Sequence, residues 1–171
     1  FLVVSFPESQ VDILPYNRAV RDLGGRTPEQ FLDEVRAIFE LTDGKPKTLG
    51  PKQFAMVVGG RWYGLRARSG SFDHSDPVAR LDISVLQVQL LAPVLGVQDP
   101  RTDERIAFVG GIRGDDELER RATATGGVAF SVRATALEDL FRVADACRVM
   151  PPKSTWFEPK LRDGLFVHKI S

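Results

Sequence analysis

The clearest pattern along the chain is an apolar stripe with helical spacing that follows a strong helix start. Residues 27–30 (TPEQ) supply a capping threonine, a proline at the first helical position and a glutamine that closes a capping box. The apolar positions that follow share one helical face: Phe31, Val35, Ile38 and Phe39. The pattern predicts a helix that begins at residue 28 and ends near residues 42–44.

Shorter apolar runs predict strands. Residues 54–58 and 62–68 are two such runs, and Gly59-Gly60 between them is typical of a hairpin turn. Further strands are expected at the remaining apolar runs, namely 1–6, 106–109, 128–132 and 165–170. The segment 69–77 (SGSFDHSDP) is polar and rich in turn-forming residues, so we expect it to be a mobile loop.

Three later segments predict helices. Residues 82–91 are apolar on more than one side, which indicates a helix central to the core with Asp82 as its cap. Residues 115–117 (DDE) form an acidic first turn that suits a helix dipole, followed by a short helix to about residue 121. Residues 135–138 (TALE) predict a second capping box. The helix behind that box carries a stripe expected to be buried: Leu137, Leu140, Phe141 and Ala144.

The mixture of these elements predicts the fold class. Helices and strands are interspersed without the regular alternation of a doubly wound fold, which favours an α+β fold. We expect a mixed or antiparallel sheet, at least one β-hairpin and three to four helices in a single domain over residues 1–171. Because apolar strands are predicted at both ends, we expect this domain to be the C-terminal part of a longer polypeptide.

Composition and charge narrow the functional classes. The chain has 171 residues, of which 23 are Lys or Arg and 23 are Asp or Glu, so its formal net charge is zero. A nucleic-acid binder usually carries a basic excess, so a nucleic-acid role is not favoured. One cysteine, Cys147, excludes an intramolecular disulfide and is expected to be a small core residue. Two histidines offer few ligands for a metal ion, and no metal site is predicted.

No apolar run reaches the ~18 residues of a membrane span. We therefore expect a cytoplasmic protein without membrane contact.

The first candidate binding segment surrounds the predicted strand 106–109. Arg101 and Arg105 precede this strand, and a glycine-rich turn with Arg113 follows it (GGIRG, 110–114). Such a turn can direct backbone N–H groups at a phosphate, and the arginines can add bidentate contacts. The segment lacks the ending of a P-loop, and its acidic neighbours 115–117 would repel a phosphate. The alternative is a tight turn held by Arg–Asp pairs.

The second candidate is the segment 150–165 (MPPKSTWFEPKLRDGL). Its three prolines and one glycine rule out a long helix and stiffen the backbone. An aromatic wall with convergent polar groups is what a small-ligand pocket requires. The ligand-binding candidates are Lys153, Ser154, Thr155, Trp156, Glu158 and Lys160. We expect Lys153 to bind a phosphate or carboxylate, Glu158 to orient a hydroxyl and Trp156 to stack on a planar group of the ligand. The alternative is a structural belt in which the aromatic side chains pack into the core.

Other candidates are weaker. His74 lies between Asp73 and Asp76, but a lone histidine in a loop is usually solvated, and His168 is expected to pack in the last strand. A polar group at residues 12–18, which includes Tyr16 and Arg18, is expected to face another domain.

Five segments together resemble the domain of unknown function 1015 family of bacterial and archaeal proteins. They are FPESQVDILPYNRAVRDL, RWYGLRAR, DPRTDERIAFVGGIRG, VADACRVMPPKSTWFEP and its continuation MPPKSTWFEPKLRDGLF. Members are roughly twice as long as this chain, which resembles their C-terminal half over its whole length. Their N-terminal half carries an Asp-Gly-His-His-Arg signature similar to that of ParB-like proteins and archaeal free serine kinase. That signature does not occur here.

The resemblance implies phosphoryl transfer to a small hydroxylated metabolite. On this hypothesis the chain is the accessory half of a nucleotide-dependent kinase or other phosphate-handling enzyme. Its partner is the N-terminal half of the same polypeptide, which would hold the catalytic groups together with ATP or ADP and Mg. The alternative is a structural or dimerisation module, with a homodimer as the expected assembly. A nucleic-acid role, implied only by the ParB-like relatives, is weakened by the zero net charge.

Overall fold

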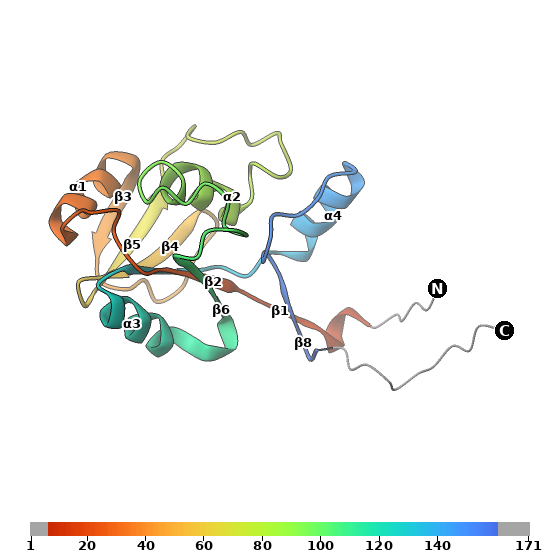
Figure 1. Cartoon of the computed structure of the whole chain (residues 1–171). Helices are drawn as coiled ribbons and strands as arrows, with labels where there is room; N and C mark the ends of the chain where they lie inside the picture. The colour runs from red at the N-terminus through yellow and green to blue at the C-terminus, as the bar shows by residue number, and fades with distance from the viewer. Residues whose placement is uncertain (1–6, 161–171) are drawn as a thin grey trace.

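A six-stranded antiparallel sheet organises the molecule (Figure 1). The computed structural model describes residues 7–160. The strand order is β3-β5-β4-β7-β2-β6. The strands are β2 (Tyr16–Val20), β3 (Phe39–Asp43), β4 (Gln53–Val58), β5 (Arg61–Ala67), β6 (Ile106–Gly110) and β7 (Val128–Val132). A separate antiparallel ribbon pairs β1 (Asp12–Leu14) with β8 (Trp156–Glu158) and extends from one end of the sheet (Figure 1).

Helices cover both faces of the sheet. Their bounds are α1 (Pro28–Ile38), α2 (Asp82–Leu86) with the π-helical turn η2 (Gln87–Leu91), α3 (Gly114–Thr125) and α4 (Leu137–Asp145). The main core lies between the sheet and α1, α2 and η2, where Phe31, Phe54 and Leu86 are fully buried. A smaller core of short side chains, including Ala19 and Ala122, lies between the sheet and α3. The predicted α+β class, the antiparallel sheet and the helix count are confirmed.

Local signals placed two elements correctly. Thr27 and Gln30 form the reciprocal capping box at the start of α1. Gly59 and Gly60 have φ angles of 56° and 71°, the left-handed values that a primed hairpin turn requires between β4 and β5. Both features are set by residues that are neighbours in sequence, so the sequence alone predicts them.

The first helix ends earlier than its pattern predicts. α1 stops at Ile38, and residues 39–43 form strand β3 along the edge of the sheet. Phe39 serves both elements, because it caps the helix and its fully buried ring packs against Phe54 at 6.0 Å. The alternation of FELTD fits a strand as well as a helix end, and pairing with β5 decides between them.

The helix α4 is exposed where the sequence predicts burial. Its N-cap is Ala136 without a side-chain bond, so the predicted capping box does not form. Of the predicted stripe, Phe141 is 55% exposed and Ala144 is exposed, while Leu137 and Leu140 are half-buried. The helix is instead anchored by Val143, which packs with Leu81 and Ile83 in a small satellite core.

Cys147 is also exposed, so its predicted core position is wrong. The sequence places it beside the helix α4 and its apolar stripe, but the chain turns there with a φ of 52° and carries the side chain outward. The predicted strands at 1–6 and 165–170, and His168, lie outside the described residues. Between residues 7 and 160, no helix is both long and apolar enough to cross a membrane.

The capping box of α1 supports a first stability prediction. Replacing Thr27 with alanine leaves the N–H of Gln30 without its side-chain acceptor. We expect the free energy of unfolding to fall by about 1 kcal/mol, the usual cost of losing an N-cap. Urea denaturation followed by circular dichroism measures it. Thr48→Ala, in the exposed loop before β4, is the matched control and should leave stability unchanged.

Candidate functional site

The segment 150–155, here called the Lys153 loop, rests on one end of β2. Its anchor is Ser154, which is buried and whose hydroxyl donates to the carbonyl of Pro151. The carbonyl of Ser154 accepts a hydrogen bond of 2.9 Å from the hydroxyl of Thr135, just beyond β7. Lys153 has a φ of 53°, a value that non-glycine residues seldom adopt, and its side chain is exposed. Hydrogen bonds within the loop and to Thr135 thus hold it in one defined shape, with backbone strain at Lys153.

A buried arginine lies beneath this loop. Arg18, in the middle of β2, is only 2% exposed. Its guanidinium donates to the carbonyl of Tyr16 and, at 3.0 Å and 3.4 Å, to the carbonyls of Lys153 and Pro152. Its central carbon lies 4.8 Å from the centre of the Phe108 ring. Among residues 7–160 it forms no ion pair with a carboxylate.

Burial of this charge changes the pKa of Arg18. Removal from water lowers the pKa of Arg18 from its usual high value to about 9, because desolvation disfavours the charged form. The guanidinium is therefore still charged at neutral pH. A buried cation that is balanced by carbonyl dipoles alone is costly to the fold.

Two aromatic rings near this arginine carry the exposed lysines of the segment. The rings of Tyr16 and Trp156 lie 5.1 Å apart, and Trp156 covers Gly110, where a Cβ atom would approach its ring carbon Cε3 to 2.6 Å. Lys153 Nζ lies 5.7 Å from the Tyr16 ring centre, and Lys160 Nζ lies 3.9 Å from that of Trp156. We call Tyr16, Arg18, Lys153, Trp156 and Lys160 the basic–aromatic cluster.

Glu158 is the acidic neighbour of this cluster. It accepts a hydrogen bond of 2.9 Å from the indole N–H of Trp156. The carboxylate therefore orients the indole ring on which Lys160 rests.

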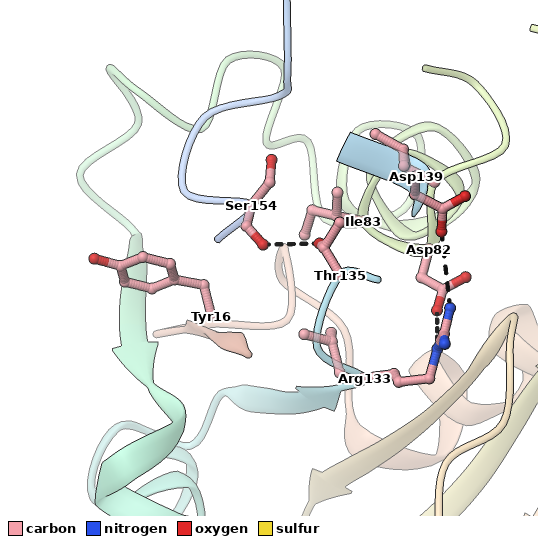
Figure 2. A pocket seen from close by; sticks show the side chains of 9 residues that line it. Tyr16, Asp82, Ile83, Arg133, Thr135, Asp139 and Ser154 are labelled. Atoms are coloured by element: carbon pink, nitrogen blue, oxygen red, sulfur yellow. Dashed lines mark hydrogen bonds and ion pairs between the residues drawn. The ribbon is translucent and has the colours of Figure 1, made fainter. Parts of the chain in front are cut away.

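A small hollow adjoins the Lys153 loop (Figure 2). Its volume is about 10 Å³, enough for a water-sized group. Tyr16 and Ser154 line one side, and a chain of ion pairs lines the other. Arg133 Nε lies 3.2 Å from Asp82, and Arg133 Nη2 lies 4.0 Å from Asp139.

The two carboxylates of this hollow are already compensated. Asp82 also pairs with Lys52 at 2.7 Å, and Asp139 lies 3.9 Å from Arg80. The main-chain N–H of Lys52 donates to Asp82 as well. Asp82 is thus the first residue of α2 rather than its cap, and it ties α2 to β4 and β7. Carboxylates engaged in this way serve to join elements, and they are poorly suited to act as general bases.

The structure separates the residues predicted to bind a ligand into two regions. Lys153, Ser154, Thr155, Trp156, Glu158 and Lys160 all lie in the Lys153 loop or in β8 and the two residues after it. Arg101 and Arg105 lie in the turn before β6, where they pair with Asp99 and Asp103 at 2.9 Å and 2.7 Å. These hydrogen bonds lower the pKa values of both aspartates. Both arginines thus form the Arg–Asp pairs of the alternative interpretation, a tight turn.

Arg113 is exposed in the short 3-10 turn η3 (Gly111–Arg113) between β6 and α3. The glycine-rich turn therefore does join a strand to a helix as predicted. Within the described part of the chain, no group of three or more His, Cys, Asp or Glu side chains is close enough to hold a metal ion.

The sequence does not identify Tyr16 and Arg18 as members of the basic–aromatic cluster, because its pattern predicts that residues 12–18 form a polar group facing another domain. Residues 16–20 are instead a central strand between β7 and β6. Asn17 is buried too, and its side-chain oxygen accepts a bond of 3.0 Å from the N–H of Val132. The run YNRAV after Pro15 could have indicated a strand, but the two polar residues in its centre conceal the apolar pattern of one.

Comparison with known proteins finds a family model that matches part of the chain and solved structures with a similar fold. Residues 1–84 match the family model described as Protein of unknown function (DUF1015). The resemblance to this family is confirmed over residues 1–84, and the match includes strand β2, which carries Tyr16 and Arg18. No curated protein sequence matches the chain.

Two similar solved structures are free serine kinase and a point mutant of it, each in complex with AMP. Both have a TM-score of 0.50 and 15% sequence identity to this chain. They cover 91% and 90% of it, respectively, and the chain spans 57% of their length. At this identity the likeness shows a shared fold.

Proposed function

We propose that this chain is the accessory part of a nucleotide-dependent small-molecule kinase, or of a related phosphate-handling enzyme, in which it binds the phosphate groups. One observation carries the proposal: Arg18 is a buried cation that has no carboxylate partner among residues 7–160, and it holds the main chain of the exposed Lys153. Phosphoryl transfer is accelerated mainly by positive charge placed around the transferring group. Arg18 and Lys153 supply such charge at one place.

The energetics support an anion at this cluster. The folded chain bears the cost of burying Arg18, and a phosphate bound nearby would offset part of that cost by Coulomb attraction. Lys153 and Lys160 lie over aromatic rings in geometries that keep their ammonium groups at the surface. An arriving phosphate can then contact both lysines without first breaking an ion pair in the described part of the chain.

In this proposal the nucleotide, ATP or ADP with Mg, is held jointly with the N-terminal half of the same polypeptide. The shared fold with the AMP-bound kinases and the DUF1015 match over residues 1–84 are its support. The acid–base groups belong to that other half, because the carboxylates of the hollow are engaged in ion pairs. Glu158 and Ser154 then serve to position the loop. A cytoplasmic location belongs to the same proposal.

Replacing Lys153 with alanine tests the proposal. We expect the affinity for ATP, ADP and pyrophosphate to fall at least about tenfold, since a charge-assisted bond to phosphate is worth about 1.5–3 kcal/mol. Calorimetric titration of the present chain and of the longer polypeptide measures the affinity. Lys47→Ala is the matched control, because Lys47 is an exposed lysine in the loop before β4. Equal affinities for the two variants would contradict the proposal.

A dimerisation module is the second candidate. Apolar side chains remain exposed on the described surface, among them Phe157 on β8 at 41% and Val149 after α4 at 85%. A phosphate-binding loop and a dimer contact can coexist on one chain.

A further inference from the structure

The strand β6 has one free edge. In the described residues it pairs with β2 alone, at the end of the sheet. The N–H of Arg21 donates to Arg105 at 3.0 Å, and the N–H of Gly111 donates to Pro15 at 2.8 Å. Antiparallel bonding alternates along a strand, so the odd-numbered residues 105–111 bond toward β2. The even-numbered Phe108 and Gly110 therefore direct their backbone groups away from the sheet.

An alanine-floored hollow of about 150 Å³ lies beside the start of this edge. Ala19 and Ala107 form its floor, because α3 packs mainly on β7 and leaves the corner of β2 and β6 less covered. Arg21, Arg121 and Thr125 are at its rim, and Glu104 closes the end next to β6. The hollow is thus apolar at its base and charged at its mouth.

A matching apolar knob lies at the other end of the same edge. Ile112 is 64% exposed, although it is a large aliphatic side chain. It belongs to the turn η3, which leads from β6 into α3. The turn leads directly into α3, so its backbone passes to the side of the sheet on which the hollow lies.

We propose that two copies of this chain associate through β6, edge to edge and antiparallel, about a two-fold axis at Phe108. In this register Phe108 faces Phe108 of the partner subunit and Ile106 faces Gly110 of the partner subunit, so the whole strand is paired. The outward N–H and C=O groups of both copies then form a continuous ladder. The contact is isologous, because each surface patch meets its own copy.

The register also brings the knob to the hollow. Residue 104 stands opposite residue 112 of the other copy, so each Ile112 reaches the end of the hollow that Glu104 closes. A two-fold axis perpendicular to the sheet keeps both α3 helices on one side, which is the side where the knob and the hollow lie. Both contacts form twice in the dimer.

Charge complementarity favours a second copy over an unrelated peptide. Glu104 and Arg113 are exposed and lie at opposite ends of the edge, and neither forms an ion pair among residues 7–160. The proposed register places each Glu104 one position from Arg113 of the partner subunit. An edge that carries acid at one end and base at the other is self-complementary when antiparallel.

The inference is independent of the proposed phosphate site, and charge reversal tests it. Sedimentation velocity of the full chain over a range of concentrations should show a monomer–dimer equilibrium. Glu104→Arg and Arg113→Glu should each weaken the dimer at least tenfold, because each creates like-charge contacts at both ends of the ladder. The double variant exchanges the charges and should restore dimerisation to within a few-fold of the original.

Two further variants complete the test. Ile112→Asp should also abolish dimerisation, because it places a carboxylate over an alanine floor. Arg61→Glu, at the exposed hairpin turn far from β6 in the sheet order, is the control and should leave the dimer intact. Circular dichroism confirms that each variant is folded. A monomeric parent chain, or a double variant as weak as either single one, would overturn the proposal.

Discussion

Replacing Gly127 with alanine is expected to lower the free energy of unfolding by about 3 kcal/mol, the upper end of the usual cost of overpacking. Gly127 is buried between the end of α3 and the start of β7. An added Cβ atom would clash with the carbonyl oxygen of Val20 and lie 2.6 Å from the carbonyl carbon of Arg21. These are backbone atoms of the central strand β2 and the residue that follows it, so they cannot move aside as a flexible side chain would.

The neighbouring Gly126 provides the matched control. It ends α3 with a φ of 69°, and nothing lies within 4 Å of an added Cβ atom. Gly126→Ala should therefore cost only the left-handed backbone strain of about 1 kcal/mol. Guanidinium denaturation of both variants measures the difference. If Gly127→Ala lowered the free energy of unfolding no more than Gly126→Ala does, the prediction that β2 and the start of β7 leave no room for a Cβ atom would be wrong.

The sequence predicts elements whose signals are local. The capping box at Thr27 and the Gly59-Gly60 turn involve residues within four positions of each other, and both form as expected. The second capping box fails for a non-local reason. The hydroxyl of Thr135 donates to the carbonyl of Ser154, 19 residues away, and so leaves the helix start without its cap. No pattern near residue 135 contains that partner.

The sequence likewise predicts only part of the candidate site. The segment 150–160 is predictable, because its prolines, lysines and aromatic residues lie close together in the sequence. Tyr16 and Arg18 are not, because their role depends on the register that places β2 beside β6 and beneath the loop. Polar residues in a central strand contradict the usual apolar pattern, and such local conflicts are expected at functional sites.

Two substitutions should separate the contribution that the Arg18 side chain makes to stability by packing from the contribution of its charge. Arg18→Ala leaves a cavity and three carbonyl oxygens without their donor, and we expect a loss of about 3 kcal/mol of stability. Arg18→Met fills the same space with an unbranched apolar chain and removes the buried charge. Because replacing a buried charge by a well-packed apolar residue is often neutral or stabilising, the methionine variant should unfold within about 1 kcal/mol of the parent.

Phosphate binding distinguishes a positioning role for Arg18 from a purely structural one. If the buried charge attracts an anion and holds the main chain of Lys153 for it, Arg18→Met should stay folded yet bind pyrophosphate about tenfold more weakly, a loss of about 1.4 kcal/mol. The same variant should keep most of the dependence of that affinity on salt, because salt screens the exposed Lys153 and Lys160 more strongly than the buried Arg18. Calorimetric titration at two ionic strengths measures both effects. A stable methionine variant with unchanged affinity would mean that Arg18 only joins the Lys153 loop to the sheet, and the phosphate site would then have to lie elsewhere.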